Sequence, residues 1–296
     1  MFARNRYVAT RLEAGDREQT VVRDLNLLNN IVRSALRQGL VRSNPIGLVE
    51  RPRFEQHEWV TMTPAEVASV ERAFREMIEA ARDEKLRWLE QARVVFILVA
   101  TMGLRRGEVL GLHWRDIDLA DPDGAVLKVR ETWVRSGHDT PKSVAGRRTI
   151  PLGPRLAEEL WQHRRRTAFQ GDDERVFGSP TKGSPMDAGR YAVTLRLALE
   201  AGGVARKLRP FHDGRHTAIT SDAISGSSAV SLMTRAGHSD FRTTQRYINA
   251  AGVSFRDEAV RAEERILGSI PVQESGTNVA VRSATDAISS TDGAPL

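Results

Sequence analysis

The sequence predicts a mainly helical fold with one small antiparallel β-sheet. Through most of the chain, apolar residues recur at three- and four-residue spacing, which is typical of amphipathic helices. Between Ala125 and Leu152 the pattern changes to short runs of β-branched residues separated by glycine-containing breaks, which indicates strands. A chain of 296 residues is long enough for one large domain or two smaller ones.

The first predicted helix covers residues 16 to 38. It has apolar residues at Val21, Leu25, Leu28, Val32 and Leu36. We expect it to end near Gly39, and Asn44-Pro45 marks a turn. Residues 1–56 are too few to enclose a good core alone.

A second group of helices begins at Thr63-Pro64-Ala65-Glu66, where Thr63 can cap, Pro64 suits the first position and Glu66 lies three residues after the cap. Another helical pattern runs from about Leu86 to Thr101. The strand-like residues are Val126, Val129, Thr132, Val134 and Arg148-Thr149-Ile150. This pattern predicts a small antiparallel sheet, with Lys142 near a turn.

Helices resume in the last part of the chain. One is expected at Gly153-Pro154, and another after Asp187 that stops at Gly202-Gly203. Further helical stretches are predicted over 213–224, 228–236, 241–249 and 254–267. From Ser269 the chain is rich in Ser, Thr, Gly and Asp, so we expect a disordered tail over 269–296.

Composition limits the functions that are open to the chain. Its net charge is +6, and most of its 44 positive residues are arginines, which favours a polyanionic partner or reflects a GC-rich genome. The absence of cysteine excludes disulfides and thiolate chemistry and fits a reducing, cytoplasmic setting. The longest apolar run, Val94 to Ala100, is far too short to cross a membrane.

Six residues in a fixed order make a set suited to breaking a phosphodiester. They are Arg105, Lys142, His212, Arg215, His238 and Tyr247. A phenol of pKa about 10 attacks phosphorus only near a base or a positive field. Two arginines can hold the phosphate oxygens and stabilise their charge in the transition state, so no metal is required.

The remaining members of the set supply proton transfer. His212 is the better candidate for accepting or relaying the tyrosine proton, and it lies one helical turn before Arg215. Lys142 can donate a proton to the departing sugar oxygen, and His238 can hydrogen-bond a phosphate oxygen.

A metal site at His212 and His216 is the competing interpretation of that motif. No Cys, Asp or Glu falls at the spacing of a third ligand in a zinc motif, and Arg215 would repel a cation. We therefore expect no metal and no other cofactor, and a structural role for His216.

The local sequences around these residues strongly resemble those of the tyrosine recombinase (phage integrase) family. The matching segments are Gly103 to Val109, Leu112 to Asp118, His212 to Thr217, and Gly237-His238 nine residues before Tyr247. The resemblance runs from about residue 57 to 267. It implies a catalytic domain over 57–268, preceded by a partial helical core-binding (SAM-like) DNA-binding segment and linker over 1–56.

The resemblance also implies an activity. Tyr247 would form a 3′-phosphotyrosyl link to double-stranded DNA, and Arg105, Lys142, His212, Arg215 and His238 would surround the scissile phosphate. The phosphotyrosyl link would conserve the energy of the broken phosphodiester, so rejoining would need no ATP. A homotetramer on paired DNA sites would complete the exchange, with accessory proteins that bend DNA or set direction as further partners.

The chain departs from the family pattern in two places. Gly214 stands where the family usually has Leu, and glycine inside a helix costs about 1 kcal/mol relative to alanine. The 56 residues before the catalytic region resemble only the last part of a core-binding domain, so we expect weak DNA affinity.

Two other functions fit parts of the sequence. A DNA-binding regulator without chemistry would use Ser227 to Asn249 as helix, turn and helix, but it would not require Arg105, Lys142 and Tyr247 together. A type IB topoisomerase uses similar residues on a single duplex, but the local sequence around Gly237-His238 favours a recombinase over a topoisomerase.

Overall fold

The computed structural model describes residues 2–54, 59–120, 124–134, 137–139, 146–179, 182–252 and 256–268. The chain divides into two compact units, Met1–Phe96 with Asp187–Thr217, and Ile97–Met186 with Ala218–Leu296. Helices α4 (Asp83–Met102) and α8 (His212–Ile224) each contribute residues to both units. Lys142 and the tail 269–296 lie outside the described residues.

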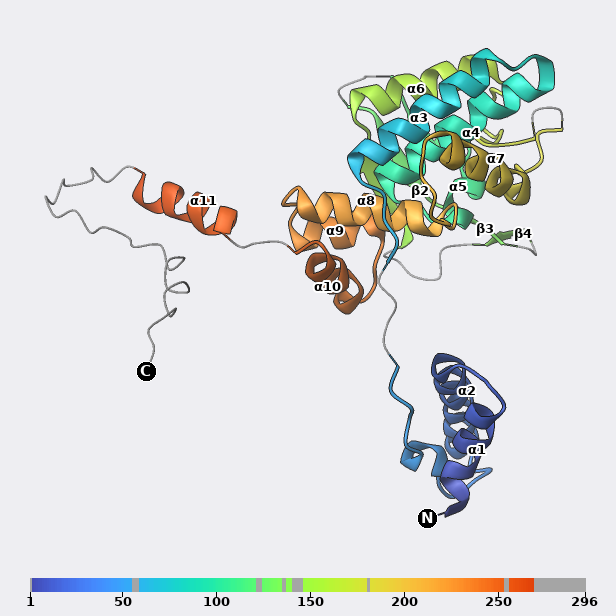
Figure 1. Ribbon diagram of the computed structural model, residues 1–296, viewed down its shortest axis with the longest axis vertical. Coiled ribbons are helices and arrows are strands. Elements are labelled where there is room, and N and C mark those ends of the chain that lie inside the picture. Colours follow the sequence, from blue (N-terminus) through green and yellow to red (C-terminus); the bar gives the residue numbers. More distant parts are fainter. Residues whose placement is uncertain are drawn as a thin grey trace, which may run out of the picture. The chain divides into compact units, whose positions relative to one another are not determined.

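The predicted fold class is confirmed, because helices dominate the described chain and its strands are short and antiparallel (Figure 1). Within the described ranges, no helix has both the length and the apolar content needed to span a membrane.

The first helices of unit 1 pack on one another around a small apolar core. They are α1 (Phe2–Glu13), α2 (Glu18–Arg37) and the 3₁₀ turn η1 (Pro45–Leu48), and α1 lies beside α2 in Figure 1. Val21, Leu25 and Val49 are buried there, with Tyr7, Val8, Leu12 and Ile46 packed against them. Asn44 caps η1 by accepting from the Ile46 N–H at 3.0 Å, which closes the predicted turn.

A second part of unit 1 is built on α3 (Pro64–Glu79) and α7 (Ala188–Ala201), which pack together. Thr63 and Glu66 form the predicted capping box at the start of α3. Ser69 Oγ donates to the Gly202 carbonyl at 2.8 Å, and Trp88 Nε1 donates to Thr194 Oγ1 at 2.9 Å. These side-chain bonds fix the register between helices that are distant in sequence.

Unit 2 contains a three-stranded antiparallel sheet of β1 (Ile117–Asp118), β2 (Val126–Val129) and β5 (Arg148–Pro151), in the order β1-β2-β5. Leu127 pairs with Ile150, and both side chains are fully buried. Strands β3 (Thr132–Val134) and β4 (Gly137–Asp139) form a separate antiparallel pair. The region 125–152 therefore holds two small sheets where the sequence predicts one.

The short helix α5 (Arg106–Gly111) packs against β3. A Cβ on Gly107 would lie 2.9 Å from the Trp133 carbonyl oxygen, and one on Gly111 would lie 3.2 Å from the Glu131 carbonyl oxygen. A side chain at position 107 would force the strand to shift, and one at position 111 would require the neighbouring backbone to move by a few tenths of an ångström, so both glycines favour the close approach of α5 and β3.

The remaining helices follow the predicted boundaries closely. They are α6 (Pro154–Arg166), α9 (Ala229–Ala236), α10 (Phe241–Ala250) and α11 (Arg256–Leu267). The 3₁₀ turn η2 (Trp114–Asp116) is not predicted by the sequence. Helix α9 packs on α10. This α9–α10 pair carries His238 and Tyr247.

Candidate active site

Arg105 stands at the junction between α4 and α5. Gly103, with φ of 64°, follows the end of α4, and Arg105 is the residue that precedes α5. The Glu108 carboxylate accepts from the Arg105 backbone N–H at 2.8 Å and from Nη1 at 2.9 Å. Arg105 Nη2 donates to the Gly237 carbonyl at 3.0 Å. The side chain is still 44% exposed, so a phosphate in solvent can reach its remaining donor hydrogens.

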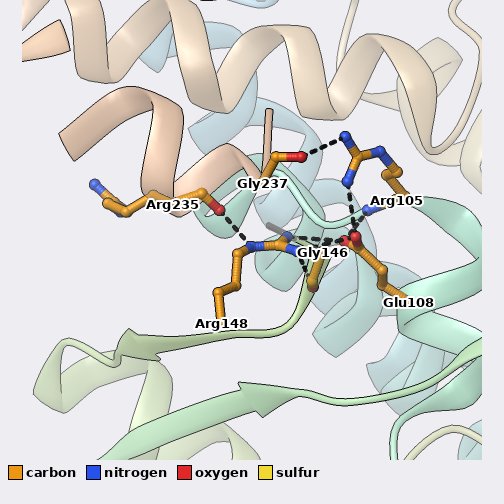
Figure 2. Close-up of polar contacts among 6 residues, drawn as sticks. All are labelled: Arg105, Glu108, Gly146, Arg148, Arg235 and Gly237. Atoms are coloured by element: carbon orange, nitrogen blue, oxygen red, sulfur yellow. Dashed lines mark hydrogen bonds and ion pairs between the residues drawn. The ribbon is translucent and has the colours of Figure 1, made fainter. Parts of the chain in front are cut away.

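Glu108 also binds a second guanidinium, that of Arg148 on β5. Arg148 Nη1 and Nη2 donate to the two carboxylate oxygens at 3.0 and 2.9 Å in a bidentate pair. Figure 2 shows the carboxylate with Arg105 on one side and Arg148 on the other. Burial by itself raises the pKa of Glu108, but the hydrogen bonds and charges of Arg148 and Arg105 outweigh it and hold that pKa below its ordinary value. The carboxylate is therefore ionised at neutral pH.

His238 follows the tight turn that ends α9. Gly237 has φ of 63°, and the His238 N–H donates to the Met233 carbonyl at 3.0 Å. This arrangement satisfies carbonyls at the helix end and needs glycine for its left-handed residue. His238 Nδ1 lies 2.9 Å from Thr244 Oγ1, so the ring is held by a buried threonine on α10.

Tyr247 lies one turn beyond Thr244 on α10, with its ring stacked on His238 at a centroid separation of 5.6 Å and an angle of 19°. It is one of three tyrosines in the chain. Tyr191 is fully buried in unit 1, and burial raises the pKa of its phenol. Tyr7 accepts a hydrogen bond from Arg11. Among the three, Tyr247 is the tyrosine that contacts another residue of the predicted set.

His212 and Arg215 lie in the first turn of α8, in the part that belongs to unit 1. His212 is exposed and Arg215 is buried. His212 Nε2 lies 3.0 Å from His216 Nε2, and the His216 ring stacks on Trp59 at 4.5 Å. His216 thus holds His212 from the buried side of the helix.

Both histidines favour the neutral form. His212 is exposed on one side, and the protein packed against its other side desolvates it in part; this partial desolvation, followed by the charge of Arg209, lowers its pKa. Burial and the neighbouring His212 lower the pKa of His216 to about 4. At neutral pH, His212 therefore has an imidazole able to accept a proton.

A third candidate ligand lies beside this histidine pair, contrary to the prediction from spacing. Asp213, the residue after His212, places a carboxylate oxygen within 4.8 Å of ring nitrogens of both histidines. That carboxylate accepts from the Arg209 backbone N–H at 2.7 Å, and from Nη2 at 2.7 Å. The guanidinium of Arg209 thus occupies the oxygens that a cation would require.

The structure adds residues that the sequence pattern did not single out. The sequence motif contains Glu108 without indicating a role for it, and the pattern around Arg148 predicts only a strand. The alternation along β5 carried the missing signal, because Arg148 shares the buried face with Ile150. The sequence gives no such signal for Thr244, since a threonine within a helix does not indicate a functional role.

The chain is similar in sequence to several curated integrases and recombinases. The putative prophage phiRv2 integrase of Mycobacterium tuberculosis is 29% identical over 76% of this chain and 57% of its own length. The tyrosine recombinase XerC-like protein of Caldanaerobacter subterraneus subsp. tengcongensis is 25% identical over 81% of this chain and 64% of its own. The chain thus spans less than two thirds of either relative.

The fold also matches a solved structure, that of the Tn1549 transposon integrase in complex with transposon right end DNA. The match covers 90% of this chain and 84% of that one, with a TM-score of 0.67 and 22% identity. Residues 69–252, more than half of the chain, match the model of the phage integrase family. The chain therefore belongs to the phage integrase family, as its motifs predict.

Proposed function

We propose that this protein is a site-specific recombinase that cuts and rejoins double-stranded DNA, with Tyr247 as the nucleophile. The observation that carries the proposal is the grouping of Arg105, His238 and Tyr247 in unit 2. Arg105 bonds the Gly237 carbonyl, and the next residue, His238, stacks on Tyr247. Membership of the phage integrase family supports the same reaction.

The proposed cleavage is a phosphoryl transfer. The Tyr247 oxygen forms a bond to phosphorus, the bond from phosphorus to the 5′ oxygen breaks, and the DNA keeps a 3′-phosphotyrosyl link. His212 takes the phenol proton, in keeping with its lowered pKa, and Lys142 gives a proton to the leaving 5′ oxygen. Arg105, Arg215 and His238 stabilise the charge on the phosphate oxygens.

Rejoining is the reverse of the same step. A free 5′-hydroxyl attacks the phosphotyrosyl phosphorus and releases the tyrosine. A DNA phosphodiester thereby replaces the phosphotyrosyl ester, and the two steps together need neither ATP nor a metal ion. We propose that four copies of the chain on two DNA sites exchange strands in this way.

The partner we propose is a DNA duplex that also contacts α2. One face of this helix is polar and exposed, opposite the buried Val21 and Leu25. It carries Arg23, Asn26, Asn30, Arg33 and Arg37. Arginines and amides on one helix face suit phosphate oxygens. We propose that residues 1–56 bind DNA and that residues 57–268 form the catalytic domain.

Trapping of the covalent intermediate tests this function. A library of random-sequence duplexes, each nicked in one strand, is incubated with the protein and resolved under denaturing conditions. Cleavage next to a nick releases a short fragment, so its 5′-hydroxyl diffuses away and the adduct accumulates. We expect adducts with the wild-type chain and with Tyr7→Phe, with or without EDTA, and none with Tyr247→Phe.

Three outcomes would overturn the proposal. They are the absence of adduct with wild type, an adduct that persists in Tyr247→Phe, and loss of the adduct in EDTA. A regulator without chemistry would bind duplexes and give the first of these.

A further inference from the structure

Arg148 is a buried arginine of unit 2 with no role in the proposed reaction. Its side chain is only 3% exposed, on the inward face of β5 next to Ile150. Besides the two bonds to Glu108, Nε donates to the Arg235 carbonyl at 2.7 Å, and Nη1 donates to the Gly146 carbonyl at 3.2 Å. Each of its three nitrogens therefore has an acceptor within the protein, and a phosphate would have to displace one.

The Arg235 carbonyl belongs to the last turn of α9. Carbonyls at a helix C-terminus carry partial negative charge and lack partners within the helix, so a buried guanidinium stabilises them. Arg105 binds the Gly237 carbonyl two residues further on. The Glu108 carboxylate joins the two guanidiniums, and each guanidinium holds one carbonyl of this helix end (Figure 2).

The end of α9 leads directly into the proposed catalytic residues. The Gly237 N–H donates to the Thr234 carbonyl at 3.1 Å, which sets the turn at His238. His238 is then bonded to Thr244 and stacked on Tyr247. A shift of the α9 end would therefore move the His238 ring and the tyrosine with it, relative to Arg105.

We infer that Arg148 is a positioning residue, which ties β5 to the end of α9 and so sets where His238 and Tyr247 lie relative to Arg105. The inference rests on the proposed function, because it takes Tyr247 to be the nucleophile. A positive charge beside the Glu108 carboxylate is not sufficient to position the end of α9. Lysine at position 148 would keep the charge but could not bond both the carboxylate and the Arg235 carbonyl in the same geometry.

A spectroscopic test reads the position of Tyr247 without DNA. The chain is labelled with 3-fluorotyrosine, which gives three ¹⁹F resonances, and Tyr247→Phe assigns one of them. In Arg148→Lys and Arg148→Gln we expect the Tyr247 resonance to shift or broaden, while those of Tyr7 and Tyr191 stay in place.

Arg93 supplies a matched control. It is also a buried arginine, and its Nε and Nη2 donate to Glu71 Oε1 at 2.9 and 2.6 Å within unit 1. Arg93→Lys breaks a comparable buried pair and should lower the melting temperature, but it should leave the Tyr247 resonance unchanged. Loss of stability and displacement of Tyr247 are thereby separated.

Single-turnover cleavage of the nicked duplex gives the second readout. We expect Arg148→Lys to lower the cleavage rate constant at least tenfold with the Kd for DNA changed less than twofold, and Arg93→Lys to change neither. An unmoved Tyr247 resonance in a folded Arg148→Lys protein would overturn the inference, as would equal loss of cleavage in both variants. Failure of the proposed function itself would instead appear as no adduct with wild type, while the ¹⁹F result would still stand.

Discussion

At the scale of single residues, three of the groups proposed to act in cleavage are each held by a neighbour that the reaction does not consume. Glu108 holds Arg105, Thr244 holds His238, and His216 holds His212. Such partners fix the direction of a side chain before the substrate arrives, which removes the cost of ordering it in the transition state. Substitutions at the neighbours should therefore impair cleavage more than they impair folding.

Thr244→Val tests this for His238. Valine keeps the shape of threonine and removes the hydroxyl that lies 2.9 Å from His238 Nδ1. We expect the single-turnover cleavage rate to fall about 5- to 30-fold, since a lost hydrogen bond of this kind is worth roughly 1–2 kcal/mol. Thr243→Val, on the same helix, should leave the rate unchanged, and equal rates in the two variants would contradict a role for the Thr244 bond.

The acid limb of the pH–rate profile tests His212. Partial desolvation by the protein packed against its ring lowers its pKa first, and the positive charge of Arg209 lowers it further. A base that must be neutral loses activity as the pH falls through its pKa, so the wild-type limb should lie below about pH 6.5, the ordinary value for histidine. Arg209→Gln removes the charge and frees Asp213, both of which raise the pKa. The limb should then move to higher pH, and a limb that stays or moves to lower pH would exclude His212 as this base.

Arg105, His238 and Tyr247, which the structure brings together, could be named from the sequence because they lie in short, ordered motifs. The partners could not, since Glu108 and Arg148 meet only when β5 packs beside α5. Charged residues are expected in solvent, and Arg148 is an exception because each nitrogen of its guanidinium has an acceptor within the protein. Lys142 lies outside the described residues and remains a prediction.

At the scale of elements, the helix boundaries followed the capping residues. Thr63, Asp187 and Gly237 each stand where the sequence predicts a helix to begin or end, because their side chains or backbone satisfy the free groups there. Helix α1 was not predicted, since its few apolar residues acquire their role only through packing on the core of Val21, Leu25 and Val49. Helix α5 was not predicted because six residues that include two glycines have little helical propensity.

Gly107→Ala tests the contact between α5 and β3. The added Cβ would lie 2.9 Å from the Trp133 backbone oxygen, which no rotamer change can relieve. We expect a loss of about 1–3 kcal/mol in unfolding free energy by chemical denaturation. Gly47→Ala, at a position with nothing within 4 Å, is the control and should cost little. A Gly107 variant as stable as the control would show that the strand is not packed this closely.

At the scale of the whole molecule, the excess of arginine should appear as salt-dependent DNA binding. Each phosphate contact contributes roughly 0.9 to the slope of log K against log salt concentration. Substituting Arg23, Arg33 and Arg37 with glutamine should lower that slope by about 3 if all three contact phosphate. Fluorescence anisotropy between 50 and 300 mM salt measures it.

A charge-matched control separates these contacts from net charge. Arg75, Arg82 and Arg87 are exposed arginines on α3, the following turn and α4. Substituting these three arginines with glutamine should leave the slope of log K against log salt concentration nearly unchanged. Equal effects of the two triple variants would mean that the α2 face is not a specific phosphate-binding surface.

The central claim is that Tyr247 carries the DNA during the reaction, and peptide mapping of the trapped adduct tests it most directly. After nuclease and trypsin digestion, the peptide that begins at Tyr247 and ends at Arg256 should carry a nucleotide through a phosphate on the tyrosine. Tandem mass spectrometry locates the modified residue. A nucleotide on Tyr247 is the predicted result, and a nucleotide on Tyr7, Tyr191 or any serine would contradict the account.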